Sequence, residues 1–226
     1  MRAARFPMPA LPSTRFEISA ARIADLPPPG LPEIAFAGRS NAGKSSAINV
    51  LARYNRLAFV SKTPGRTQLI NFFRCGDLGF LVDLPGYGYA QVPLEVRREW
   101  QGVLEHYLTR RPSLMGLILI MDSRHPLTPL DRQMLGWFAP TRKPVHVLLT
   151  KSDKLSRSAA AAVLIQAKRG LADYGMPVTV QLFSSLKKTG LEEAERTITG
   201  WMGKIGPPKE MPPAKGDESQ GQNALM

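Results

Sequence analysis

The sequence is poor in features that would point to a secreted or membrane protein. Among its 226 residues it has one cysteine, Cys75, so no disulfide can form within the chain. This fits a reducing cytosol, and we expect Cys75 to be an inert residue of a buried strand. The longest apolar run, residues 114–121, is far shorter than the ~20 residues that span a bilayer. The N-terminus has arginines but is broken by prolines, unlike a signal peptide. We therefore expect a cytoplasmic protein that does not enter membranes.

Acidic side chains are also scarce. The chain has 18 Asp and Glu against 30 Lys and Arg, for a formal net charge of +12. Residues 1–30 carry +2 and residues 204–226 carry zero, so +10 lies on residues 31–203. A basic folded surface favours a polyanionic partner such as RNA or a ribonucleoprotein. The alternative is that this charge only maintains solubility.

Proline divides the chain into three parts. Residues 1–30 are proline-rich and predict a leader with an extended linker, in which Phe16 and Ile18 can add a short edge strand. Residues 31–203 predict one folded domain. Residues 204–226 carry two further proline pairs and then polar residues, which predict a disordered tail.

Within the middle part, apolar strands alternate with segments of helical periodicity. This pattern predicts an α/β fold with a mostly parallel six-stranded sheet and helices on both faces. Ligands of such sheets bind at the carboxyl ends of the strands. The expected strands cover residues 33–37, 67–74, 80–83, 114–121, 145–149 and 178–183. The expected helices begin at Lys44, follow Pro93, span 127–138 and 160–171, and close the domain after a capping box of Thr189 and Glu192.

The first chemical motif lies between the expected strand at 33–37 and the helix that begins at Lys44. Its small residues let backbone N–H groups curl around phosphates. Lys44 can reach the β- and γ-phosphates, Ser45 can offer its hydroxyl to Mg²⁺, and the helix N-terminus favours negative charge. The alternative is a glycine-rich turn without a ligand. The predicted phosphate-binding residues are Gly38, Arg39, Ser40, Asn41, Ala42, Gly43, Lys44, Ser45 and Ser46.

The second motif ends the hairpin formed by the strands at 67–74 and 80–83. Here Asp83 can hold Mg²⁺ through water, and Gly86 can offer its N–H to a γ-phosphate. An Asp-x-x-Gly sequence alone would also fit an ordinary turn. Its position directly after the hairpin favours a nucleotide-binding role. We expect contacts to nucleotide or metal from Asp83, Leu84, Pro85 and Gly86.

Between the first helix and the next strand lies a loop at residues 61–68. A mobile loop at this place would carry the threonine that completes Mg²⁺ coordination, ordering with GTP and relaxing with GDP. We choose Thr67 for this role, with Thr63 as the alternative. The predicted contacts of this segment are Gly65, Arg66, Thr67, Gln68 and Leu69.

The last two motifs point to guanine. Asp153 can accept hydrogen bonds from guanine N1–H and the 2-amino group together. Adenine lacks both donors, so binding it would leave a buried carboxylate unpaired. Lys151 can lay its stem along the base, and a backbone N–H of residues 184–186 can bind guanine O6. The alternative for 150–153 is an exposed polar turn. The predicted base-binding residues are Thr150, Lys151, Ser152, Asp153, Phe183, Ser184 and Ser185.

The strings GRSNAGKSS, SKTPGRTQLINFF, DLPGYGYA and TKSD resemble those of the EngB family of bacterial GTPases over roughly residues 15–203. As in that family, Thr150 heads the guanine motif where most GTPases carry Asn, a departure expected to weaken base binding slightly. The resemblance implies a single P-loop GTPase domain at 31–203, Mg²⁺ held by Ser45, Thr67 and Asp83, and catalysis through Lys44, Thr67 and Gly86. It also implies a role in large ribosomal subunit assembly, with a historical link to septum formation. We expect a monomer that binds the subunit or its rRNA.

Tyr87 stands where Ras-like enzymes place the glutamine that orients the attacking water, which predicts slow intrinsic turnover. Asn41 can hold K⁺ beside the phosphates, or it can be only a turn residue. Tyr87 and Tyr89 can touch RNA or protein, or can be packed. Three rival functions remain: an ATP-using P-loop enzyme, which Asp153 argues against, an RNA-binding module with little turnover, and an Era-like GTPase, which needs a further RNA-binding domain.

Overall fold

The computed structural model describes residues 11, 13–54, 57–58, 69–87 and 94–203; of residues 94–100 it describes the backbone helix. The strands form one sheet in the order β1-β3-β4-β2-β5-β6-β7. The pairs β1–β3 and β3–β4 are antiparallel, and the other four pairs are parallel. The strands are β1 (Thr14–Ala20), β2 (Glu33–Gly38), β3 (Ile70–Cys75), β4 (Gly79–Asp83), β5 (Leu114–Asp122), β6 (Val145–Thr150) and β7 (Val178–Leu182).

The predicted α/β class is confirmed, but the predicted count of six strands is one too few, because β1 joins the sheet. β1 pairs with β3 from Thr14 opposite Cys75 to Ala20 opposite Ile70. Only the two ends of β1 are buried, so its sequence carries little of the apolar alternation that marks a strand. The short edge strand expected at Phe16 and Ile18, within the stretch predicted as leader and linker, is thus confirmed as β1. The domain boundaries at 30/31 and 203/204 stay predictions.

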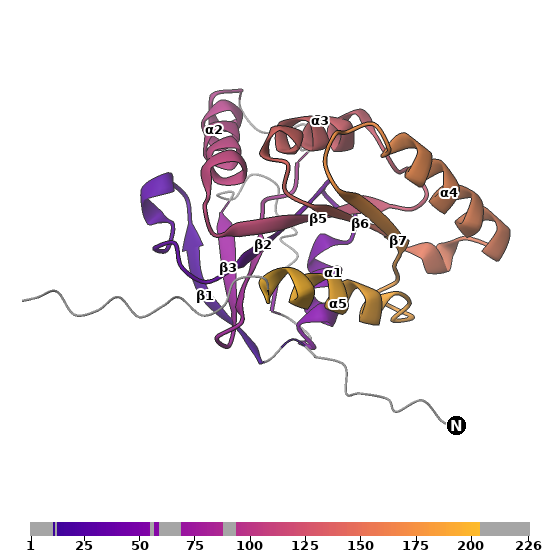
Figure 1. Cartoon of the computed structure of the whole chain (residues 1–226), viewed down its shortest axis with the longest axis horizontal. Helices are drawn as coiled ribbons and strands as arrows, with labels where there is room; N and C mark the ends of the chain where they lie inside the picture. Colours follow the sequence, from indigo (N-terminus) through magenta and orange to yellow (C-terminus); the bar gives the residue numbers. More distant parts are fainter. Residues whose placement is uncertain (1–10, 12, 55–56, 59–68, 88–93, 204–226) are drawn as a thin grey trace, which may run out of the picture.

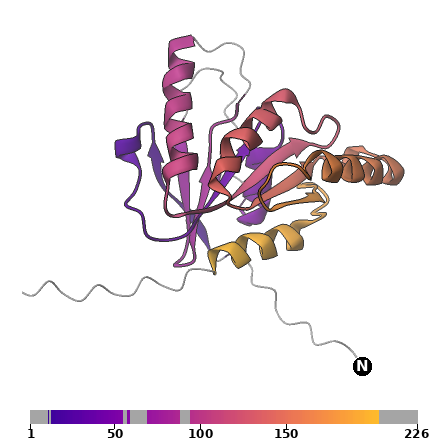
Figure 2. The ribbon, with the colours of Figure 1, turned by 45° about the horizontal axis from the view of Figure 1, so that its top comes forward.

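Helices cover both faces of the sheet, as predicted (Figure 1). α1 and α5 pack on one face, while α2 and α3 lie on the other (Figure 2). Within the described chain, no helix is long and apolar enough to cross a membrane. The helices are α1 (Lys44–Leu51), α2 (Leu94–Arg110), α3 (Pro129–Phe138), α4 (Arg157–Gly170) and α5 (Leu191–Met202). Short 3-10 turns occur at Ile23–Asp25, Ala139–Thr141 and Ser152–Lys154.

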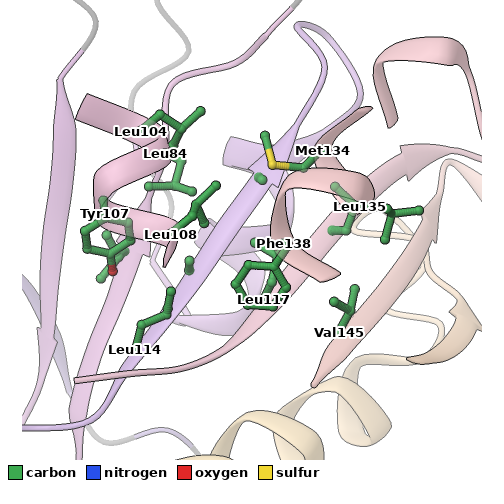
Figure 3. Packing of buried hydrophobic residues seen from close by; sticks show 14 of the residues in the cluster. Leu84, Leu104, Tyr107, Leu108, Leu114, Leu117, Met134, Leu135, Phe138 and Val145 are labelled. Atoms are coloured by element: carbon green, nitrogen blue, oxygen red, sulfur yellow. The ribbon is translucent and has the colours of Figure 1, made fainter. Parts of the chain in front are cut away.

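The larger core lies between the sheet and helices α2 and α3 (Figure 3). There Leu104 and Leu108 of α2, and Leu135 and Phe138 of α3, are fully buried against the strands. Burial of side chains this size contributes about 1.5–3 kcal/mol each, which holds the helices in place. The packing of α2 and α3 therefore fixes the positions of the strands that they cover.

Two helix starts show how side chains fix the ends of the elements. In α3, the Thr128 side chain accepts from the Asp131 N–H and Asp131 accepts from the Thr128 N–H, a reciprocal capping box. The predicted capping box of α5, from Thr189 and Glu192, is wrong. The N-cap is Gly190 at a φ of 73° with no side-chain cap, because the Thr189 carbonyl accepts from the Ser184 N–H at 3.1 Å.

A buried ionic cluster lies at the amino ends of the parallel strands. Glu33, the first residue of β2, accepts from Arg111 Nη2 at 2.6 Å and from Tyr107 Oη at 2.9 Å. Arg111 Nη2 also donates to the Pro27 carbonyl at 2.7 Å. Both ionised side chains are almost completely buried, and each has its partners within the chain. This cluster fastens the segment before β2 to the end of α2.

Candidate nucleotide-binding site

The loop between β2 and α1 has the form of a phosphate-binding loop. β2 ends at Gly38, and α1 begins at Lys44 with Gly43 as its N-cap. Gly43 has a φ of 101°, a backbone conformation that glycine adopts readily and other residues avoid. The first N–H groups of α1 have no partners inside the helix, so they are available to an anion at this end. The loop residues Arg39 to Ala42 thus connect a strand directly to an anion-attracting helix start.

Lys44 and Asp83 meet at the centre of the site. The Lys44 ammonium forms an ion pair with Asp83 Oδ1, joining the start of α1 to the end of β4. Both side chains are mostly buried. The sequence predicted that Lys44 reaches phosphates and that Asp83 serves a metal, and the two groups here neutralise each other.

The segment after β4 runs against the phosphate loop. The Tyr87 N–H donates to the Gly38 carbonyl at 3.3 Å, and the Ser40 N–H donates to the Tyr87 carbonyl at 3.0 Å. A Cβ built on Gly86 would lie 3.4 Å from the Ser40 nitrogen and 3.7 Å from the Gly38 carbonyl oxygen, so the Gly86 backbone is in close contact with the phosphate loop. Leu84 is fully buried and its N–H donates to the Phe36 carbonyl at 3.0 Å. Gly86 therefore lies directly beside the phosphate loop, as its predicted contact requires.

Tyr87 is a packed residue. Its side chain is 9% exposed, and its hydroxyl donates to Asp131 Oδ1 of α3 at 2.9 Å. Burial, with the nearby Asp131 carboxylate, raises the pKa of the Tyr87 phenol. Of the two alternatives for this tyrosine, the structure shows packing. Tyr89 lies outside the described residues.

Side chains of the motif at residues 150–153 form hydrogen bonds with the phosphate loop. The Thr150 hydroxyl at the end of β6 contacts the Ala42 carbonyl and lies 3.1 Å from the Met121 carbonyl. The Lys151 ammonium donates to the Asn41 carbonyl at 2.7 Å. Thr150 thus connects β5, β6 and the phosphate loop with one short side chain.

Asp153 is oriented by the loop after β7. The Ser184 hydroxyl donates to Asp153 Oδ1 at 2.6 Å and lowers the pKa of this carboxyl. The Ser152 N–H and hydroxyl both donate to the Phe183 carbonyl, at 3.2 and 3.0 Å. The Ser184 N–H is engaged by Thr189, so the N–H predicted to meet guanine O6 is that of Ser185 or Leu186. The two base-binding motifs, 31 residues apart, therefore form one unit.

Asp122 is a residue of the site that sequence analysis missed. It is the last residue of β5 and is buried, and its Oδ2 accepts from Lys151 Nζ at 2.9 Å and from Arg124 Nη2 at 2.6 Å. Burial opposes its ionisation, but these hydrogen bonds outweigh that effect and lower the pKa of the Asp122 carboxyl. Its position after a buried strand was the available signal, because the other site residues share it.

Several predicted residues are brought together and four are not described. The phosphate loop, the residues at 83–86, Thr150 to Asp153 and the loop at 183–185 all lie at the carboxyl ends of β2, β4, β6 and β7. Leu69 immediately precedes β3. Four predicted contacts lie outside the described residues: Gly65, Arg66, Thr67 and Gln68. The alternative threonine, Thr63, lies outside them as well.

Comparison with known proteins agrees with this geometry. Residues 33–151 match the family described as "50S ribosome-binding GTPase". A protein of Aromatoleum aromaticum, "Probable GTP-binding protein EngB", is 66% identical over 196 residues, 87% of this chain and 91% of the relative. A protein of Methylobacillus flagellatus with the same name is 59% identical over 207 residues, 92% of this chain and 99% of the relative.

Solved structures share the fold. The crystal structure of a probable GTP-binding protein engB aligns with a TM-score of 0.61 at 20% identity, covering 76% of this chain and 100% of that one. Aquifex aeolicus Era bound to GDP.AlF4⁻ aligns with a TM-score of 0.61 at 18% identity, covering 80% of this chain and 60% of that one. At these identities the likeness concerns the fold.

The sheet order, the phosphate loop at its centre and the motif matches define a P-loop GTPase, an enzyme that hydrolyses GTP to GDP and phosphate. Identity of 59–66% over most of the chain narrows the class further. The chain belongs to the EngB family of GTP-binding proteins.

Proposed function

We propose that this GTPase is a Mg²⁺-dependent switch, monomeric and cytoplasmic, that acts in assembly of the large ribosomal subunit. The observation that carries the proposal is the match of residues 33–151 to a family described by its binding to the 50S ribosome. The net charge of +10 on residues 31–203 supports it, because rRNA is a polyanion. The resemblance to EngB proteins extends the same argument to the rest of the chain.

GTP lies across the carboxyl ends of the strands in this proposal. Lys44 moves from Asp83 to the β- and γ-phosphates, and the N–H groups of the phosphate loop and of Gly86 surround them. Asp153, held by Ser184, accepts from the guanine N1–H and 2-amino groups, while the Lys151 stem covers the base. The proposal is supported by the contact of the Lys151 ammonium with the Asn41 carbonyl at 2.7 Å and of the Ser184 hydroxyl with Asp153 at 2.6 Å, which hold the base motif against the phosphate loop and orient Asp153.

The residues at the centre of the site suit Mg²⁺. This ion prefers oxygen ligands and is usually held by one or two protein groups together with substrate phosphates. Ser45 offers a hydroxyl and Asp83 a carboxylate, and the Lys44 cation now neutralises that carboxylate. A bound Mg²⁺ neutralises charge that develops on the phosphates during hydrolysis. Thr67 is the proposed third ligand.

Intrinsic turnover is slow in this proposal. The place of the water-orienting glutamine holds Tyr87, whose hydroxyl donates to Asp131 at 2.9 Å and is committed to that contact. Unassisted GTPases of comparable design turn over on the order of 10⁻⁴ s⁻¹. We propose that K⁺, held by the Asn41 side-chain oxygen, raises the rate. Equal hydrolysis rates in K⁺ and Na⁺, with and without ribosomal subunits, would contradict the role of Asn41.

The test of the ribosomal role is co-sedimentation with purified 50S subunits at one fixed salt concentration. The protein is loaded with GDP or with a non-hydrolysable GTP analogue, and 30S subunits serve as the control. We expect binding to 50S with the analogue and little binding with GDP or to 30S. Equal binding in both nucleotide states would favour an RNA-binding module, and no binding would direct attention to the division apparatus.

A further inference from the structure

A buried hydrogen bond connects the residue after Gly86 to helix α3. Tyr87 Oη donates to Asp131 Oδ1 at 2.9 Å, and Asp131 is completely buried. The second carboxylate oxygen, Oδ2, accepts from the Thr128 N–H at 2.9 Å and from the Thr128 hydroxyl at 2.7 Å. Asp131 is thus fixed by the capping box of α3, so its other oxygen is a rigid acceptor for the tyrosine.

The backbone of Tyr87 is fixed as well. It forms a parallel bridge with Arg39 of the phosphate loop, through the Gly38 and Ser40 hydrogen bonds described above. The Arg39 side chain also approaches Asp131, with Nε 3.9 Å from Oδ2. One residue therefore joins the phosphate loop by its backbone and α3 by its side chain, immediately after the predicted γ-phosphate contact.

We propose that Tyr87, held by Asp131 of α3, is a positioning residue that fixes the Gly86 N–H toward the γ-phosphate of GTP. This inference rests on the proposed contact between Gly86 and that phosphate. The peptide that carries the Gly86 N–H is one residue from a side chain with both its hydroxyl and its backbone committed. The orientation of this N–H then depends on α3 and not on the residues that follow Tyr87.

Positioning of this kind affects the two nucleotides differently. GDP has no γ-phosphate, so its binding does not use the Gly86 N–H. Removing the Tyr87 hydroxyl therefore weakens a GTP analogue relative to GDP by about tenfold, the scale of one hydrogen bond to a charged group. A residue that contributed to folding alone would leave the ratio of the two affinities unchanged.

The experiment compares dissociation constants of full-length variants for GDP and for a non-hydrolysable GTP analogue, with Mg²⁺ present. Tyr87→Phe removes only the hydroxyl, and Asp131→Asn alters its acceptor. Tyr107→Phe is the matched control, since Tyr107 Oη donates to the buried Glu33 carboxylate at the same distance of 2.9 Å, at the other edge of the sheet. Gly86→Pro removes the backbone N–H and so tests the γ-phosphate contact itself.

We expect Tyr87→Phe, Asp131→Asn and Gly86→Pro to raise the ratio of the analogue constant to the GDP constant, and Tyr107→Phe to leave it unchanged. If Gly86→Pro alone raises the ratio, the γ-phosphate contact stands and the positioning role of Tyr87 is wrong. If Gly86→Pro leaves the ratio unchanged too, the contact is wrong and the positioning role is wrong with it. Tyr87→Phe keeps the test decisive should Asp131→Asn or Gly86→Pro fail to fold.

Discussion

Two buried ion pairs lie at opposite edges of the same parallel sheet, and they differ in how completely they are satisfied. At the amino edge, Glu33 and Arg111 have partners from Tyr107 and Pro27, all within the chain. At the carboxyl edge, Lys44 and Asp83 contact each other, next to phosphate-loop residues that are partly exposed. The ion pair at the amino edge has all its partners within the chain, whereas the ion pair at the carboxyl edge is accessible to a ligand.

The difference separates structural from functional polar groups. A buried ion pair without further partners loses more in desolvation than it gains in attraction, so the pair at the amino edge needs its additional hydrogen bonds. In the proposed function, phosphate and Mg²⁺ replace Asp83 and Lys44 as the partners of the two charges at the carboxyl edge. Burial alone does not identify a functional site, since both ion pairs are buried. The two pairs are distinguished by the number of hydrogen-bond partners that each has within the chain.

The largest effect is expected from breaking the closed pair. Arg111→Met leaves the Glu33 carboxylate buried and unpaired, which costs about 3–5 kcal/mol in the free energy of unfolding. Urea denaturation measures the loss. The double variant Glu33→Leu with Arg111→Met should recover part of it, because no charge then remains buried. A loss below about 1 kcal/mol would mean that the amino-edge pair does not stabilise the fold.

Breaking the open pair should affect ligand binding more than folding. Lys44→Met removes the cation proposed to bind the phosphates, and GDP affinity should fall by about 100-fold or more, equivalent to about 2.7 kcal/mol. Isothermal titration calorimetry measures this value, with Arg111→Lys as the control that keeps a cation at the amino edge. The comparison between the two edges would fail if Lys44→Met bound GDP normally.

The proposed contact of Asp153 with guanine can be tested by replacing one carboxylate oxygen with an amino group. Asp153→Asn presents one acceptor and one donor, which suits the 2-oxo group of xanthine in place of the guanine 2-amino group. We expect GDP affinity to fall by about tenfold or more and affinity for xanthosine diphosphate to rise. Ser184→Ala removes the hydroxyl that orients Asp153 and should cost only a few-fold, about one neutral hydrogen bond. Unchanged GDP binding in Asp153→Asn would exclude this role.

The smallest effect concerns Asp122 and depends on pH. Its folded pKa is lowered by Arg124 and Lys151 against the opposing effect of burial, so the ionised carboxylate stabilises the fold above its unfolded pKa of about 3.9. That contribution is about 1 kcal/mol, because the Arg124 and Lys151 side chains are partly exposed, and it is lost as pH falls through the lower folded pKa.

The Asp122 contribution can be measured by denaturation of wild type and Asp122→Asn between pH 7 and pH 2. The difference in the free energy of unfolding should be constant near neutral pH and shrink below about pH 4. A difference that stays constant to pH 2 would show that ionisation of Asp122 does not contribute. Asp77→Asn, on an exposed turn, is the control for nonspecific acid effects.

Much of this site is local in sequence. The phosphate loop, Asp83 to Gly86 and the Thr150 motif each follow a buried strand, so the pattern of apolar residues alone predicts that they lie at one edge of the sheet. The hairpin of β3 and β4 followed from the turn at residues 76–79. These features depend on residues that are close together in the chain, so they can be predicted from local sequence patterns.

The missed features depend on distant partners. Tyr87 and Asp131 are 44 residues apart, and Glu33 and Arg111 are 78 apart. The cap of α5 was misplaced because the Thr189 carbonyl is engaged by Ser184, a contact that no local pattern shows. β1 was expected as a short edge strand but was left out of the count of six, because its pairing with β3 spans 50 residues or more and its own apolar signal is weak.

Cys75 gives the β1 edge of the sheet a built-in chemical reporter. It is the single thiol of the chain, fully buried at the end of β3, with its sulfur 3.4 Å from the Thr14 hydroxyl of β1. Burial raises the pKa of the thiol, which disfavours the reactive thiolate in the closed sheet. Alkylation therefore proceeds chiefly through molecules in which β1 has separated from β3. The modification rate of the unaltered protein measures how often its first strand detaches.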